Sequence, residues 1–204
     1  QYELTRYDIK THPRGFVTTQ RVLTASPTKL RRETALPEGT LLQVQNGKAA
    51  LLDVPGKGVQ KQQARPSLWD LWITVGEPLS AVQAGDRFVR QLEQHKVDLD
   101  QVSYTRFDGR VSYIIGAKAQ DATKPQLWLD KESFLPTRAV TFRPGPDGKP
   151  IQDDVRFLGW GSAAGGNWLP KTIERYRDGT LVERATLVSV ERNQPADRTL
   201  FETR

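Results

Sequence analysis

Cysteine and methionine are absent from this sequence of 204 residues, and histidine occurs only twice, as His12 and His95. Without cysteine, the fold has neither disulfide bonds nor thiolate ligands for a metal ion. Two histidines so far apart in the sequence also argue against a histidine-based metal site. We therefore expect no metal and no cofactor. A chain of this length can bury a hydrophobic core large enough to hold a single domain, which we place at residues 1–204.

Long apolar runs are absent as well. No segment approaches the ~20 apolar residues of a membrane-spanning helix, so we do not expect an integral membrane protein. The sequence also lacks the charged start and apolar stretch of a signal peptide. Because it begins at Gln1 and contains no methionine, we expect a processed product from which a signal peptide or lipoprotein leader was removed. The alternative is an engineered start.

The charge is only moderately basic, with 30 Lys and Arg against 24 Asp and Glu, which gives a net charge of +6. The excess is spread along the chain and mixed with acidic residues. No basic run is interleaved with aromatic residues, as a base-stacking surface requires, and we therefore expect no nucleic-acid partner. An anionic membrane surface or an acidic partner fits this charge better.

Turn signals are frequent. Asn or Asp followed by Gly suits a tight hairpin because both residues tolerate positive φ. Each such signal is flanked by strand-like sequence, which predicts hairpins in series and hence an antiparallel meander. The four signals are Asn46-Gly47, Asp108-Gly109, Asp147-Gly148 and Asp178-Gly179.

The stretch LWLDKESFLPTRAVTF predicts a further hairpin, with strands at Leu127–Leu129 and Leu135–Phe142 and a turn at Asp130–Ser133. Leu127 and Leu129 share one face of the strand, and Trp128 lies on the other. Large apolar groups on both faces indicate a sheet that is covered on each side. Pro136, and Pro170 in the similar stretch WLP, are interpreted as strand-entry prolines.

The middle of the sequence is helical. Ser67–Val75 has Leu68, Leu71, Trp72 and Val75 at helical spacing, and a second helix is expected to begin with Asp86 as its N-cap. This helical insertion, at about residues 66–97, interrupts the run of strands and does not alternate with them. The order favours an α+β fold.

Catalytic signatures are weak. The glycine-rich GSAAGG at 161–166 matches no phosphate-binding pattern, and Asp153-Asp154 is interpreted as a solvated pair at a strand start. His95 lies near the end of the second helix, where the helix dipole favours a cation, and this explains it without catalysis. We do not expect an enzyme.

The strongest signal is apolar. The first helix carries Trp69 and Trp72 and is apolar nearly all round, so it must be buried or must cover something. One interpretation is an ordinary core helix. The other is a lid over an apolar ligand cavity, since such pockets are mostly apolar with few polar groups. The residues expected to form that lid and cavity are Leu68, Trp69, Leu71, Trp72, Tyr113, Ile115, Leu127, Leu129, Phe134 and Leu135.

Several stretches resemble one known family. They are RFDGRVSYIIGA, PQLWLDKESFLPTRAVTF, VRFLGW and NWLPKTIERYRDGTLVERATLVSV in the second half, and SPTKLRRE followed by VQNGKAALL in the first. Together they are similar to the LolA-like proteins, the outer-membrane lipoprotein-sorting family, from about Gly15 to Phe201. The shared features are strand-and-turn patterns.

The resemblance implies a strongly curved antiparallel sheet, an open half β-barrel, with a helical lid on its concave side. It also implies a periplasmic carrier, soluble or anchored through its leader, for a lipid or a lipoprotein acyl chain. The arginine that precedes a strand-starting proline in the archetypal carrier is Ser26 here, before Pro27. The alternative is an envelope protein-interaction or sensing module, whose cavity is filled by its own side chains and whose partner is an envelope protein.

Overall fold

The structure, a computed structural model, describes residues 2–8, 12–26, 28–63, 81–163, 165–166, 169–191, 195 and 197–203. The chain divides into two compact units. One contains Gln1–Ser67 and Ala185–Arg204, and the other contains Leu68–Arg184. Strands make up most of the described chain, and the α-helix among the described residues is α2, at Ala81–Gln94.

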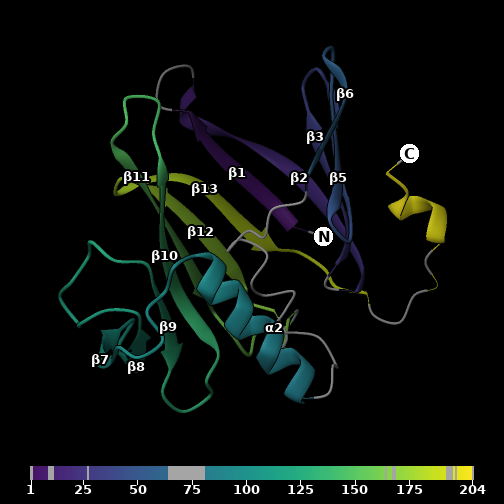
Figure 1. The fold of residues 1–204 in the computed structure, drawn as a ribbon. Coiled ribbons are helices and arrows are strands. Elements are labelled where there is room, and N and C mark those ends of the chain that lie inside the picture. The colour runs from purple at the N-terminus through teal and green to yellow at the C-terminus, as the bar shows by residue number, and fades with distance from the viewer. Residues whose placement is uncertain are drawn as a thin grey trace. The chain divides into compact units, whose positions relative to one another are not determined.

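The first unit is an antiparallel meander in which each strand pairs with the next along the chain. A short 3₁₀ helix, η2 (Arg198–Phe201), belongs to the same unit and buries Phe201. Arg31 ties η2 to the sheet, because its Nη1 donates to the carbonyl of Leu200 at 3.2 Å. The strands are β1 (Tyr2–Asp8), β2 (His12–Ser26), β3 (Lys29–Leu36), β4 (Gly39–Asn46), β5 (Ala49–Val54) and β6 (Gly58–Gln63), seen at the purple and blue end of the chain in Figure 1.

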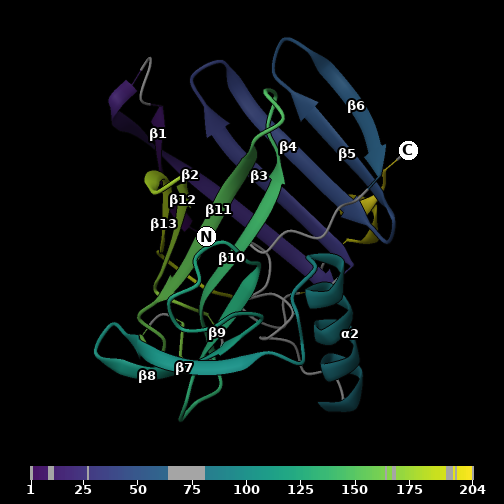
Figure 2. The same ribbon diagram turned by 60° about the vertical axis from the view of Figure 1, so that its left-hand side comes forward.

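The second unit holds α2 and a second antiparallel run, ordered β7-β8-β9-β10-β11-β12-β13. Its last strand, β13, passes into the first unit at Ala185. Figure 2 shows β10 and β11 side by side, and α2 belongs to the same unit. The strands are β7 (Val102–Phe107), β8 (Arg110–Ile115), β9 (Gln126–Asp130), β10 (Pro136–Pro144), β11 (Pro150–Leu158), β12 (Thr172–Arg177) and β13 (Thr180–Leu187).

The turn signals are confirmed as hairpins. At Asp108-Gly109 both residues have positive φ, 49° and 77°, and at Asp178-Gly179 the values are 47° and 77°. These are the conformations that a two-residue turn of the I′ type requires. The hairpin predicted in LWLDKESFLPTRAVTF is also present, as β9 and β10, and Pro136 is the first residue of its second strand.

The second helix is longer than predicted. It begins at Ala81, so Asp86 lies inside it and is not its N-cap. Asp is common at N-cap positions but also occurs inside helices, and the glycine before it, Gly85, costs a helix only ~1 kcal/mol relative to alanine. The helix expected at Ser67–Val75 lies outside the described residues. Among the helices that are described, none has the length and apolar character needed to cross a membrane.

The strands in the middle of the second unit are buried on both faces, as predicted. Leu127 is 0% exposed on one face of β9, and Trp128 is 7% exposed on the other. In β10 the neighbours Ala139 and Val140 point to opposite faces and are both buried. The observed architecture is therefore antiparallel sheet covered on both sides, while the half-barrel and the lid remain predictions.

Candidate ligand-binding surface

The pairing of β8 with β9 brings four of the predicted cavity residues together on one face. Tyr113 lies opposite Leu129, and Ile115 lies opposite Leu127. Residues that are directly opposite in an antiparallel pair have Cβ atoms ~5 Å apart and point to the same face. Strand pairing therefore places these four residues side by side, while their role as a cavity lining stays a prediction.

This face is closed in the middle of the sheet and open toward β7. Leu127 is fully buried, whereas Val102 is 56% exposed and Tyr104 is 74% exposed. Both lie on the same face, because Val102 is opposite Ile115 and Tyr104 is opposite Tyr113. With Phe134, they form what we call the aromatic patch: Val102, Tyr104, Tyr113 and Phe134.

Phe134 is held in an unusual conformation. Its φ is +56°, in the left-handed region that bulky residues rarely adopt. Its ring stacks on Tyr113, with centroids 6.2 Å apart and planes at 15°, yet the residue remains 63% exposed. Backbone strain of this kind persists only where the surrounding structure enforces it, and it is concentrated at functional sites.

Asp130 enforces the turn that carries Phe134. One carboxylate oxygen, Oδ1, accepts from the backbone N–H of Glu132 at 3.1 Å and from the N–H and hydroxyl of Ser133 at 2.8 and 2.9 Å. The carbonyl of Asp130 also accepts the N–H of Phe134 at 2.9 Å. Burial by itself raises the pKa of Asp130, but the bonds from Ser133 and Glu132 and the charge of Arg110 outweigh it and lower the pKa.

The other predicted site residues have different positions. Leu135 is half-buried, and its carbonyl accepts the N–H of Asp130 at 2.9 Å, so its backbone closes the turn. The four lid residues Leu68, Trp69, Leu71 and Trp72 lie outside the described residues, and their role stays a prediction. Val102 and Tyr104 were not predicted as site residues. They alternate with polar residues along β7, and residues that face a buried core show the same alternation.

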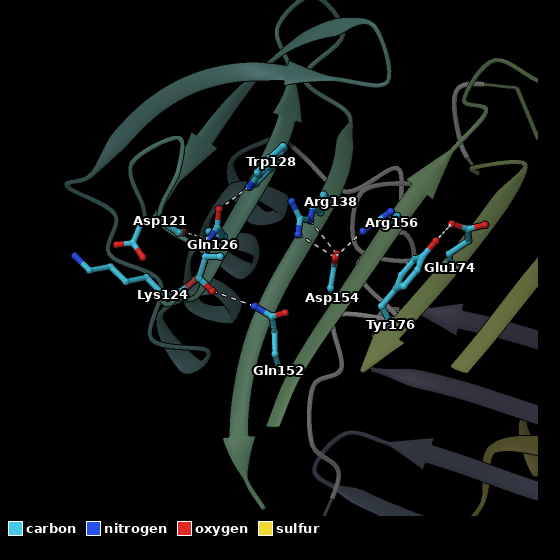
Figure 3. Close-up of polar contacts among 11 residues, drawn as sticks. Asp121, Lys124, Gln126, Trp128, Arg138, Gln152, Asp154, Arg156, Glu174 and Tyr176 are labelled. Carbon is cyan, nitrogen blue, oxygen red and sulfur yellow. Dashed lines mark hydrogen bonds and ion pairs between the residues drawn. The ribbon is translucent and has the colours of Figure 1, made fainter. Parts of the chain in front are cut away.

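The opposite face of the sheet carries a row of polar contacts (Figure 3). Trp128 donates its Nε1–H to Gln126 at 2.8 Å, and the guanidinium carbon of Arg138 lies 4.7 Å from the centroid of the Trp128 ring. Arg138 also makes a bidentate contact with the buried carboxylate of Asp154, in which Nε donates to Oδ1 at 3.0 Å and Nη2 donates to Oδ2 at 2.9 Å. Such paired bonds are the strongest arginine–carboxylate contacts.

The row continues across β11, β12 and β13. Arg156 contacts Asp154 at 3.2 Å and lies 4.0 Å from the ring centroid of Tyr176. Tyr176 and Arg184 both donate to the buried Glu174, each at 2.8 Å. Burial, together with the bond to Glu174 and its charge, raises the pKa of Tyr176, so its phenol stays a donor.

We interpret this row as a clamp that holds the strands together, since its charged groups are matched to one another. It corrects one interpretation of the sequence. Asp154 is not a solvated residue at a strand start, because it lies inside β11, is 4% exposed and binds two arginines. The adjacent Asp153 points to the other face and contacts Arg143 at 2.8 Å.

His95 also differs from expectation. It follows α2, and its backbone N–H donates to the carbonyls of Gln91 and Leu92 at 3.2 and 3.1 Å. Its buried Nε2 has no hydrogen-bond partner within the described part of the chain, and burial lowers the pKa of the imidazole. Burial therefore disfavours the cation that was expected at this position. Among the described residues, no group of three or more His, Cys, Asp or Glu side chains could hold a metal ion.

Solved structures with the same architecture extend over almost the whole chain. A LolA-superfamily protein from Nitrosomonas europaea superposes with a TM-score of 0.57 at 13% identity, covering 99% of this chain and 88% of its own. An outer membrane lipoprotein-sorting protein domain from Vibrio parahaemolyticus gives a TM-score of 0.54 at 12% identity, with 98% and 86% covered. The chain shares its fold with these proteins. The resemblance seen in the sequence is thus confirmed at the level of the fold.

A third structure, a DUF1329 family protein from Desulfovibrio piger, gives a TM-score of 0.50 at 11% identity and covers 99% of this chain and 87% of its own. No protein-family model matches the sequence, and no curated protein does. The case for a binding role of the aromatic patch therefore rests on the geometry of the patch itself.

Proposed function

We propose that this protein is a non-enzymatic periplasmic carrier or binding module for a hydrophobic ligand, a lipid or a lipoprotein acyl chain. The observation that carries the proposal is the aromatic patch. It exposes Val102, Tyr104 and Phe134 on the face that buries Leu127 and Ala139 farther into the sheet. Clusters of large apolar side chains that are exposed to solvent mark ligand-binding or partner-binding sites. The structures with the same fold include one named for lipoprotein sorting.

The chemistry of the patch suits an acyl chain. An acyl chain offers only dispersion contacts and a hydrophobic driving force of ~25 cal/mol per Å² of buried apolar area. The stacked rings of Tyr113 and Phe134 provide a broad apolar surface. The buried residues Leu127 and Ala139, which follow on the same face, continue that surface into the sheet. Trp69 and Trp72 would complete it as a lid.

The test is lipid extraction and mass spectrometry of the natively purified protein, followed by displacement of a fluorescent fatty acid. We expect a bound lipid, and we expect Val102→Ser to weaken binding of the fluorescent fatty acid several-fold. Val59→Ser is the matched control, because Val59 has the same 56% exposure on β6 of the other unit. If no lipid co-purifies, and neither Val102→Ser nor Trp69→Ala/Trp72→Ala changes binding, the carrier proposal fails.

A second candidate is an envelope protein-interaction or sensing module. It is favoured by the filling of the same apolar face farther from β7, where Val155, Phe157 and Ile173 are at most 3% exposed. A face closed by the protein's own side chains leaves less room for a ligand. Two results would support this candidate. The purified protein would contain no lipid, and variants of the aromatic patch would lose binding to an envelope protein partner while their binding of a lipid probe stays unchanged.

A further inference from the structure

The strand β7 is the last strand of its unit's sheet and has one unpaired edge. Gly116 donates its N–H to the carbonyl of Gln101 at 2.8 Å, so the backbone groups at odd positions face β8. In an antiparallel pair these groups alternate in direction. The N–H and C=O groups of Val102, Tyr104 and Arg106 therefore point away from β8. Within the described part of the chain, no strand pairs with them.

This edge has few of the features with which proteins protect exposed strands. Native edges carry charged side chains, lysine above all, proline or a β-bulge, or are kept very short. The charged residue of β7 is Arg106. The strand VSYTRF has neither lysine nor proline, and its pairing with β8 runs without a register shift from Val102 to Phe107. The terminal strand of the other unit, β6, shows the contrast, because it carries Lys61 and four further polar or glycine residues.

We propose that β7 pairs with β7 of a second copy of this chain, antiparallel, about a two-fold axis between the two Thr105 residues. In this register Tyr104 lies opposite Arg106 of the second copy, and the outward N–H and C=O groups of both residues bond to each other. The guanidinium then lies beside an exposed phenol ring, a cation–π contact of ~0.5–1 kcal/mol at such sites. Shifting the register by two residues would place Tyr104 against Tyr104 and lose this contact.

The two-fold arrangement uses the β7 edge of each copy and leaves no β7 edge for a third, so this contact closes as a dimer. A strand of six residues forms few intermolecular hydrogen bonds, each contributing ~0.5–1.5 kcal/mol net. We expect an interface in the smaller class, below ~1,200 Å², and hence a reversible dimer that depends on concentration.

Cysteine cross-linking tests the register directly, because the natural sequence contains no cysteine. Thr105→Cys places two sulfurs across the axis in a non-hydrogen-bonded pair, where Cα atoms are ~4.5 Å apart and a disulfide can close. Val102→Cys is the control, since it is more exposed but lies ~20 Å from its counterpart in this register. We expect the Thr105→Cys protein to form a covalent dimer at least tenfold faster than the control. Equal rates, or no dimer, would overturn the proposal.

Sedimentation velocity tests the association without a cross-link. We expect the natural protein to shift toward a dimer with rising concentration, and Tyr104→Lys to need at least tenfold more protein for the same shift. Val59→Lys, the same kind of change on β6, should behave like the natural protein. A natural protein that stays monomeric throughout, or an equal effect of both lysine variants, would refute the pairing. Circular dichroism checks that each variant is folded. If Tyr104→Lys does not fold, the cross-linking experiment still tests the proposal.

Discussion

The backbone strain at Phe134 leads to a prediction that separates strain from ring contacts. A residue with a side chain pays ~1–2 kcal/mol in the left-handed region, whereas glycine does not. Glycine in turn loses ~0.5–1 kcal/mol relative to alanine, because it has more conformational freedom in the unfolded chain. Phe134→Gly and Phe134→Ala lose the same ring. We therefore expect the glycine variant to be more stable than the alanine variant by ~0.5–1 kcal/mol.

Lys131, in the same turn, is the matched control. It is exposed and is not among the residues with positive φ. At this position glycine has only its entropic disadvantage, so Lys131→Gly should be less stable than Lys131→Ala by ~0.5–1 kcal/mol. The unfolded-state contribution of glycine is common to both positions. Subtracting one glycine–alanine difference from the other therefore isolates the strain, which we expect to be ~1–2 kcal/mol.

Equilibrium unfolding in urea gives the four free energies. The reasoning is wrong if the glycine–alanine difference has the same sign and size at both positions, because Phe134 would then carry no strain. The same variants also bear on function. Phe134→Gly, although more stable than Phe134→Ala, should bind a fluorescent fatty acid several-fold more weakly than the natural protein, while Lys131→Gly should bind it unchanged.

Three further predictions concern charged groups. The pKa of Asp130 is lower in the folded than in the unfolded protein, so the carboxylate stabilises the fold above the unfolded pKa of ~3.9, and this stabilisation is lost as pH falls through the folded pKa. Asp130→Asn should reduce the free energy of unfolding by ~1–2 kcal/mol at neutral pH. In urea titrations this difference should shrink between pH 5 and pH 2. The pKa of His95 is also lowered, so the native state loses stability as pH falls below ~6.5, and His95→Gln should abolish that part of the pH dependence. Arg138→Ala should cost ~2–3 kcal/mol, because Asp154 keeps only Arg156, and should leave fatty-acid binding unchanged.

Local signals in the sequence were sufficient to predict the hairpins. Asp108-Gly109 and Asp178-Gly179 specify their turns through backbone conformation alone, and the strands around them follow from alternation. The start of α2 was predicted wrongly, because Asp86 was interpreted as an N-cap although it lies inside the helix. A helix boundary depends on the sum of many small preferences, and a single residue rarely decides it.

The site was predicted only in part, for a different physical reason. Tyr113 and Leu129 were recognised because alternation assigns residues to a face. Alternation cannot show whether that face is covered, and so Tyr104 was missed although it lies directly opposite Tyr113. The buried pair of Arg138 and Asp154 was missed because its partners are 16 residues apart and meet only through strand register.

The two faces of the second unit differ in how their side chains are held. On one face, Arg138, Asp154 and Glu174 link neighbouring strands by buried, charge-assisted bonds that need no ligand. On the other, Phe134 adopts a strained backbone and leaves its ring 63% exposed. A strained backbone that leaves its ring exposed costs stability and is unexpected at a position that serves the fold alone. The matched polar row supplies stability elsewhere in the unit, so the sheet tolerates this cost, and the exposed ring is consistent with the binding role proposed for the aromatic patch.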